Sequence, residues 1–342
     1  KNKKLKTNHR EIVKNIKNLS PKVKKSLDFA FKRILSFHKN QKSKDIKFSD
    51  KLKNKIDYKY QPLNSVGIYI PGGNASFPST VLMNAIPAML AGVKRIVIAN
   101  PVRDKVQSAA VLYAAKKCGV KEIYRVGGAQ AIAALTYGTK TIQRVDKIVG
   151  PGNIYVAAAK KMVFGEVGID MIAGPSEITV VADKSSNIKW VAADLIGQAE
   201  HDINAQCILI SKNKALIDKV QKELKLQLES LPRKKIALGS LKKNGLLIFA
   251  NSDKKISDII NIIAPEHLEL SVDKYKSILK NVKNAGSICT GKYSAMAVTD
   301  YCAGSNHTLP THSSAKFFSG LSVFDFFKRI SYINLSKKGI ET

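Results

Sequence analysis

The chain has 342 residues, of which 44% are apolar, and a formal net charge of +31. This length suits two cores of ordinary size. The sequence contains no run of about 18 apolar residues, which a bilayer-spanning helix would need, and no apolar signal-peptide core near its start. The four scattered cysteines exclude a disulfide-rich secreted scaffold. We therefore expect a soluble cytoplasmic protein with reduced thiols.

The first predicted element is a lysine-rich helical region at residues 1–65, expected to pack on the second of two lobes. Ile12, Ile16, Leu27 and Ile34 are among its apolar residues at helical spacing. Residues 1–60 contain 20 Lys and Arg against 5 Asp and Glu. The remaining lysines are dispersed, and no aromatic residues alternate with them on which bases could stack. We interpret the charge as solvated surface rather than a nucleic-acid site, and keep polyanion binding as an alternative.

Residues 66–177 are predicted to form a first α/β lobe, because short β-rich runs alternate with alanine-rich helical stretches. The strands are VGIYI, RIVIA, EIYRV and KIV, and each precedes a stretch with helical periodicity. Such alternation is typical of βαβ units with a parallel, twisted sheet. Residues 178–325 repeat the pattern as a second Rossmann-like lobe, with ligands expected at the carboxyl ends of the strands.

Residues 326–342 are interpreted as the start of a C-terminal tail that is truncated here. The stretch FDFFKRISYINL, at 324–335, is helix-like, and the chain ends soon after it.

Three glycine clusters follow strands of the first lobe: PGGN at 71–74, GGAQ at 127–130 and GPGN at 150–153. Glycine there lets backbone amides approach a ligand, and a following helix N-terminus favours an anion such as a pyrophosphate. None of the three is GxGxxG, so each is equally well explained by a tight turn.

Polar side chains that could bind a metal or move a proton gather in the second lobe. Gln198 and His201 are three residues apart at the end of a helix, so they can converge on one metal. Glu266 and His267 are adjacent before a strand and suit proton transfer at neutral pH. Asp300 is a candidate zinc ligand, and His307 is a candidate ligand or orienting group. Each is also explained by ordinary hydrogen bonding.

Several long motifs in one order give the chain a resemblance to histidinol dehydrogenases. They run from about Val66 to Ser336 and include VGIYIPGG, VGGAQAIAALTYGT, IVGPGNIYVAAAK, IDMIAGPSE, QAEHD, APEHLEL, GSICTG and AGSNHTLPT. The resemblance implies oxidation of L-histidinol through the aldehyde to L-histidine, the last steps of histidine biosynthesis, with reduction of two NAD+. It also implies one zinc ion per site and a homodimer.

The resemblance also implies the roles of individual residues. Nine positions match the family's motifs. Tyr69, Gln130 and Asn153 match positions that bind NAD, Gln198, His201 and Asp300 match zinc ligands, and Glu266 and His267 match the catalytic pair. Ser176 matches a substrate contact, and the zinc ligands and the catalytic pair are expected to contact the substrate as well. His267 would remove the alcohol proton and Glu266 would activate water.

The sequence departs from the family pattern at its end. In the family a C-terminal segment donates a further zinc-binding histidine to the partner subunit, and no histidine follows Leu335 here. We therefore expect impaired activity of this form, and an inactive truncated homologue is an alternative. A zinc hydrolase using Glu266 and Asp300 is disfavoured, because it would have no use for three glycine-rich turns.

Overall fold

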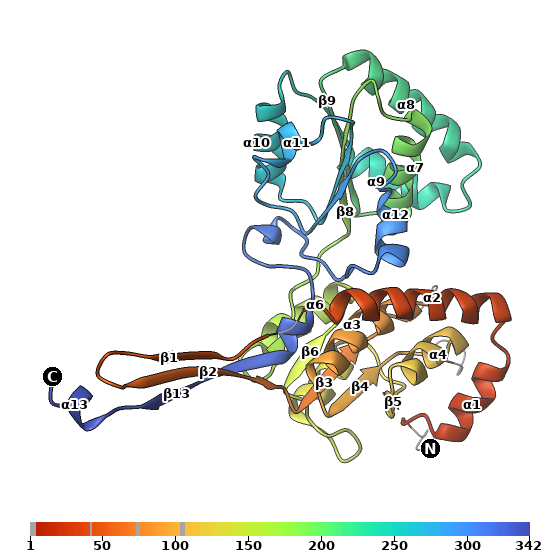
Figure 1. Ribbon diagram of the computed structural model, residues 1–342. Coiled ribbons are helices and arrows are strands. Elements are labelled where there is room, and N and C mark those ends of the chain that lie inside the picture. Colours follow the sequence, from red (N-terminus) through yellow and green to blue (C-terminus); the bar gives the residue numbers. More distant parts are fainter. Residues whose placement is uncertain (1–4, 42, 73–75, 103–106) are drawn as a thin grey trace. The chain divides into compact units, whose positions relative to one another are not determined.

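The computed structural model of the protein describes residues 5–41, 43–72, 76–102 and 107–342. The chain divides into two compact units (Figure 1). Unit 1 runs up to Asp170 and also contains Leu321–Thr342, whereas unit 2 is the continuous segment Met171–Gly320. Both units are α/β with a five-stranded sheet, which confirms the predicted fold class of two Rossmann-like lobes with parallel sheets. None of the helices in the described ranges is long and apolar enough to cross a membrane.

The sheet of unit 1 is parallel and has the strand order β5-β4-β3-β6-β7. Its strands are β3 (Ser65–Tyr69), β4 (Arg95–Ala99), β5 (Glu122–Tyr124), β6 (Lys147–Val149) and β7 (Gly168–Ile169), and its connecting helices are α3 (Pro78–Ala91), α4 (Ala109–Lys117), α5 (Gly128–Tyr137) and α6 (Ile154–Val163). The chain adds β4 and β5 on one side of β3 and then β6 on the other. A topological switch point therefore lies between the carboxyl ends of β3 and β6, where open α/β sheets bind ligands.

The N-terminal helices α1 (His9–Lys17) and α2 (Pro21–His38) belong to unit 1. This differs from the expectation from the sequence, which was that the region packs on the second lobe. Their apolar faces join the core formed with α3 and α4, in which Ile34 and Leu112 are both buried. Burial of these stripes fixes the helices against unit 1, while their lysines remain on the solvent side.

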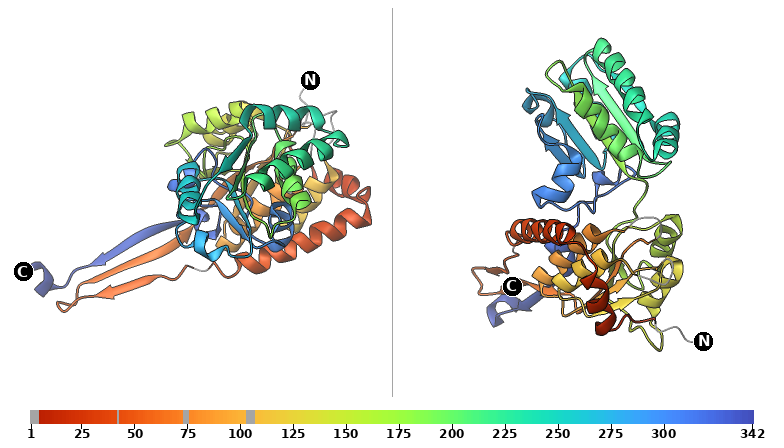
Figure 2. Two further views of the ribbon diagram at one scale, coloured as in Figure 1. Left: turned by 90° about the horizontal axis from the view of Figure 1, so that it is seen from above. Right: turned by 90° about the vertical axis from the view of Figure 1, so that its right-hand side faces the viewer.

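A three-stranded antiparallel sheet extends from unit 1 as an arm (Figures 1 and 2). It consists of β1 (Ile46–Ser49), β2 (Lys55–Pro62) and β13 (Phe327–Asn334), and is flanked by the 3-10 turn η3 (Val323–Phe326) and the short helix α13 (Lys337–Ile340). The prediction of helix across FDFFKRISYINL is wrong for Phe327–Asn334, because that segment pairs with β2 along its whole length. Residues 46–62 had likewise been assigned to the helical region.

The sheet of unit 2 is also parallel, with the order β10-β9-β8-β11-β12. Its strands are β8 (Glu177–Ala182), β9 (Gln206–Ser211), β10 (Leu246–Phe249), β11 (His267–Ser271) and β12 (Ser287–Thr290). Helices α7 (Ile188–Ala199), α8 (Lys214–Glu229) and α9 (Lys234–Asn244) cover one face, and α10 (Asp253–Ile263) and α11 (Lys276–Leu279) cover the other (Figure 1). The short helix α12 (Met296–Val298), the π-helical turn η1 (Thr299–Ala303) and the 3-10 turn η2 (Ser314–Lys316) follow β12.

Side chains alternate between the two faces of the sheet along β11. Leu268 and Leu270 enter the core on the α10 side. His267 and Glu269 therefore point to the opposite face, toward α7. Both are almost completely buried.

Candidate active site

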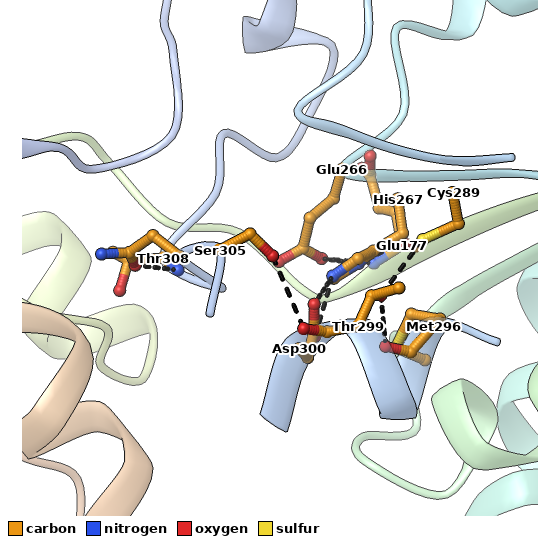
Figure 3. A network of polar contacts seen from close by, with 10 residues as sticks. Glu177, Glu266, His267, Cys289, Met296, Thr299, Asp300, Ser305 and Thr308 are labelled. Carbon is orange, nitrogen blue, oxygen red and sulfur yellow. Dashed lines mark hydrogen bonds and ion pairs between the residues drawn. The ribbon is translucent and has the colours of Figure 1, made fainter. Parts of the chain in front are cut away.

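His267 lies at the centre of a buried polar cluster in unit 2 (Figure 3). Its Nδ1 is 3.2 Å from the backbone oxygen of Glu177, and its Nε2 is 3.0 Å from Oδ2 of Asp300. A carbonyl oxygen and a carboxylate oxygen can only accept, so both ring nitrogens must carry a hydrogen. The arrangement thus favours the imidazolium cation.

The pKa of His267 agrees with this geometry. Burial by itself lowers the pKa, but the hydrogen bond to Asp300 and the charges of Glu266 and Asp300 outweigh burial and raise the pKa to about 9. His267 can act as a base only when it is neutral. The contact with Asp300 keeps His267 protonated and therefore opposes a role as a base, unless another cation binds Asp300.

Glu266 is held directly before β11, with 7% of its surface exposed. Its Oε2 accepts a hydrogen bond of 2.8 Å from the backbone nitrogen of Glu177 and lies 3.7 Å from Nδ1 of His267. Burial is the main reason that the pKa of Glu266 is raised to about 7. At neutral pH this carboxyl group can therefore either take up or release a proton.

Asp300 comes from the π-helical turn η1, a kind of turn frequently found at functional sites. The preceding residue, Thr299, anchors the turn: its Oγ1 donates to the backbone oxygen of Met296 at 2.8 Å and contacts Sγ of Cys289 at 3.1 Å (Figure 3). These contacts join η1 to α12 and β12. They fix Asp300 in front of His267.

Gln198 and His201 lie at the end of α7. Gln198 is 2% exposed, and its backbone oxygen accepts from the backbone nitrogen of His201 at 3.2 Å. Desolvation is the largest cause of the lowered pKa of His201, although part of its surface is open to solvent. The charges of His267 and Asp300 also act on His201. The end of α7 therefore borders the same polar region.

A metal ion is compatible with this region by donor chemistry. Within the described ranges, no three His, Cys, Asp or Glu side chains stand close enough to hold an ion as they lie, and the Asp300 carboxylate is directed at His267. However, the buried Nε2 of His307 has no hydrogen-bond partner in the described parts of the chain, and the charges of Asp300, His267 and His201 act on it. Imidazole nitrogens with a carboxylate and an amide oxygen are suitable ligands for zinc.

The predicted NAD-binding residues lie at the carboxyl edge of the unit 1 sheet. Tyr69 ends β3, and its hydroxyl oxygen accepts from the backbone nitrogen of Gly128 at 3.0 Å. Gln130 is in the first turn of α5, and Asn153 caps α6 by accepting from Tyr155 and Val156. Tyr69 and Asn153 therefore follow the two strands that flank the switch point, β3 and β6, while Gln130 follows β5 at the edge of the sheet. The first glycine cluster, PGGN, lies partly outside the described residues, since 73–75 are not described.

The predicted substrate residue Ser176 and the predicted catalytic residue Glu266 lie at the amino edge of the unit 2 sheet. Ser176 directly precedes β8, and Glu266 directly precedes β11. They are thus at the amino ends of the unit 2 strands, whereas the prediction had placed ligands at the carboxyl ends in both lobes. The deviation arises because the parallel pair β8–β11 sets Glu177 beside Glu266 at their starts.

Several structural partners of these residues had not been predicted. Glu177 orients both Glu266 and His267, the predicted catalytic pair, through its backbone. Asp194 on α7 and Glu269 on β11 are buried carboxyl groups joined by a side-chain hydrogen bond. Glu269 could have been recognised, because it alternates with two leucines in a strand of a parallel sheet, where both faces are normally buried and a carboxyl group needs a partner.

Comparisons with known proteins agree with this architecture. The family model described as histidinol dehydrogenase matches residues 1–342. A histidinol dehydrogenase of Pelagibacter ubique (strain HTCC1062) is 61% identical over 334 residues, covering 97% of the chain and 78% of that protein. A histidinol dehydrogenase of Caldanaerobacter subterraneus subsp. tengcongensis is 50% identical over 340 residues, covering 99% of the chain and 78% of that protein. The crystal structure of histidinol dehydrogenase from Elizabethkingia anophelis superimposes with a TM-score of 0.95 at 38% identity, covering 99% and 79%.

Proposed function

Because the chain belongs to the histidinol dehydrogenase family of NAD-dependent oxidoreductases, we propose that it oxidises L-histidinol to L-histidine in two steps at the polar cluster of unit 2. The observation that carries the proposal is the placement of Glu266, His267 and Asp300 within one buried network. Unit 1 binds the nucleotide through Tyr69, through Gln130 in the first turn of α5 and through Asn153 at the N-cap of α6.

In the first step the alcohol loses a hydride and a proton. The hydride passes to the nicotinamide ring of NAD+, which becomes NADH, and His267 accepts the hydroxyl proton, which leaves the aldehyde. His267 must be neutral to accept this proton. The Glu177 carbonyl then keeps the proton of the neutral ring on Nδ1 and leaves Nε2 as the basic nitrogen.

In the second step water adds to the aldehyde and the hydrate is oxidised by a second NAD+. Glu266 takes a proton from the attacking water, a role for which a carboxyl group with a pKa of about 7 is suited. The hydrate then gives a hydride to NAD+ and its remaining hydroxyl proton to the solvent, yielding the carboxylate. Ser176, at the start of β8, is proposed to contact the substrate.

We assign Gln198, His201 and Asp300 as the residues that hold zinc. When bound, zinc supplies a fixed positive charge that orients the nitrogen atoms of the substrate. A metal-directed Asp300 would no longer be free to pair with His267. The chain's own residues then perform the proton transfers.

We also propose that the protein works as a homodimer. The arm carries apolar side chains with large exposed fractions, among them Phe48 at 56% and Ile333 at 65%. Exposed apolar surface of this kind marks protein interaction sites. Sedimentation velocity measures the oligomeric state, and a monomer at micromolar concentration would contradict the proposal.

The activity is tested by following NADH absorbance with L-histidinol, NAD+ and zinc. We expect two NADH for each L-histidinol consumed, with L-histidine as the product identified by mass spectrometry. A His267→Gln variant is the matched control for contaminating dehydrogenases. The absence of NADH formation above that control would refute the assigned activity.

A further inference from the structure

A buried ion pair in unit 1 takes no part in the proton transfers described above. Lys160 of α6 is paired with Asp170, which directly follows β7, and their side chains are 2% and 1% exposed. A lysine is rarely buried to this extent unless it is paired. Removing two charges from water is costly, and apolar residues of similar shape often stabilise a protein equally well. Stability alone therefore gives little reason for this pair.

Both members of the pair also bind the backbone of one residue, Gly150. Nζ of Lys160 donates to the backbone oxygen of Gly150 at 3.1 Å, and the backbone nitrogen of Gly150 donates to Oδ2 of Asp170 at 2.7 Å. The other carboxylate oxygen of Asp170 accepts from Lys160. The peptide groups on both sides of Gly150 are thus fixed by one charged pair.

Gly150 occupies a position that is closed to other residues. Its φ is +106°, and a Cβ built there would lie 2.3 Å from the backbone oxygen of Tyr69. The glycine therefore lies directly on the last residue of β3, at the switch point of the sheet. Three residues later Asn153 caps α6, and its Oδ1 accepts hydrogen bonds from the helix N-terminus. The amide Nδ2 of that side chain is a further donor that a ligand can use.

We propose that Lys160 and Asp170 are positioning residues for the dinucleotide, since they fix the turn at 150–153 in its binding conformation before the nucleotide arrives. The inference rests on the proposed NAD site at Tyr69 and Asn153. Because Asp170 neutralises Lys160, the pair acts through geometry rather than by attracting phosphate charge. Preorganisation of a turn raises affinity by avoiding the entropic cost of ordering it on binding.

The test compares nucleotide and alcohol binding in the same variants. Lys160→Met combined with Asp170→Leu removes both charges and approximates both side-chain shapes. We expect the Kd of NADH, measured by the fluorescence of the nucleotide, to rise about tenfold, as loss of roughly one net hydrogen bond implies. The Kd of L-histidinol, measured by calorimetry in the presence of zinc, should stay within twofold, because its residues are in unit 2.

Lys161→Met is the matched control, since Lys161 is the exposed neighbour on α6. It removes a positive charge from the same helix but leaves both contacts of Gly150 in place, so NADH affinity should change less than twofold. Equal weakening in this control and in the double variant would overturn the inference, because it would show that the loss does not depend on the contacts of Gly150. A folded double variant that binds NADH like the parent would overturn it as well.

Hydrogen exchange of the unaltered protein tests the same point if the double variant does not fold. The backbone amide of Gly150 should be protected without nucleotide and gain little protection when NADH is added. Strong protection only with NADH would show that the turn is ordered by the ligand, against the inference. If the unaltered protein binds no NADH, the proposed function fails and the inference with it; if it binds NADH without the expected differences, the inference alone fails.

Discussion

Nε2 of His267 lies 3.0 Å from Oδ2 of Asp300, although the two residues are 33 positions apart in the chain. The same carboxylate is proposed to hold zinc, and the same imidazole is proposed to accept a proton. The two roles depend on each other, because a carboxylate committed to zinc releases the ring that it otherwise holds protonated. This dependence leads to the first two predictions.

The catalytic pair should separate the two oxidation steps. His267→Gln should slow oxidation of L-histidinol by about 10²- to 10⁴-fold, as expected for loss of a general base. Glu266→Gln should slow oxidation of L-histidinal by a similar factor and affect the alcohol step less. NADH formation from each substrate separately measures both rates. Glu229→Gln, an exposed change on α8, serves as the control, and equal losses for both substrates in Glu266→Gln would contradict the assignment.

The stability of the metal-free protein should decrease with rising pH. The pKa of His267 is raised in the folded state from 6.5 to about 9, so its contribution is fully present below pH 6.5 and is lost as pH rises through 9. Glu266, raised from 4.5 to about 7, loses its contribution between those values, in the same direction. The free energy of unfolding, measured with denaturant and chelator, should fall by at most about 3 kcal/mol for His267 between pH 6.5 and 9. His267→Asn should be flatter across this window, and a parallel curve would count against the ion pair.

At the buried carboxyl pair of Asp194 and Glu269, replacing Glu269 by glutamine should leave the protein stable, whereas replacing it by alanine should destabilise the protein. Two carboxyl groups share a hydrogen bond only if one is protonated, and burial, then the charge of Asp194, raise the pKa of Glu269 to about 8. Glu269→Gln supplies a permanent donor and should keep stability within about 1 kcal/mol, whereas Glu269→Ala should cost about 2–4 kcal/mol by leaving Asp194 buried without this partner. Thermal and denaturant unfolding distinguish the two variants. Equal losses would mean that packing, rather than the hydrogen bond, matters at this position.

Gly150→Ala should impair nucleotide binding more than alcohol binding. Its Cβ would lie 2.3 Å from the backbone oxygen of Tyr69 at a φ that alanine rarely adopts, so the turn must move. We expect a loss of at least about 1–3 kcal/mol in stability and a clear increase in the Kd of NADH. Gly165→Ala is the matched control: its φ is +107°, but no atom lies within 4 Å of the added Cβ. Similar NADH affinity in both variants would show that the close approach to Tyr69 is unimportant.

The architecture was largely predictable because its signals are local. Each β-rich run followed by an alanine-rich stretch defines one βα unit, and β3, β4 and β6 are found where the pattern placed them. The arm was missed because its apolar residues also fit a helical period. Whether Ile330 lies in a helix or a strand depends on pairing with Lys59, which is remote in the sequence.

The candidate site was predictable as a set of residues but not as a set of contacts. The motifs indicated Glu266, His267 and Asp300, whereas the contact between His267 and Asp300 depends on how η1 is anchored by Thr299. The role of Gly150 was visible only as a turn signal. Its two charged partners, Lys160 and Asp170, lie 10 and 20 residues further on in segments that read as ordinary helix and loop.

The interruption of unit 1 by unit 2 has a consequence for biosynthesis. Strand β13 pairs with β2 across about 270 residues, so this arm cannot close until the ribosome has made nearly all of the described chain. Unit 2 is continuous and can fold while β2 still lacks its neighbour. Closing so long a loop is entropically costly and slow, and an unpaired β2 edge is prone to association with other chains. We therefore expect nascent chains arrested before residue 327 to depend on chaperones more than the released protein does.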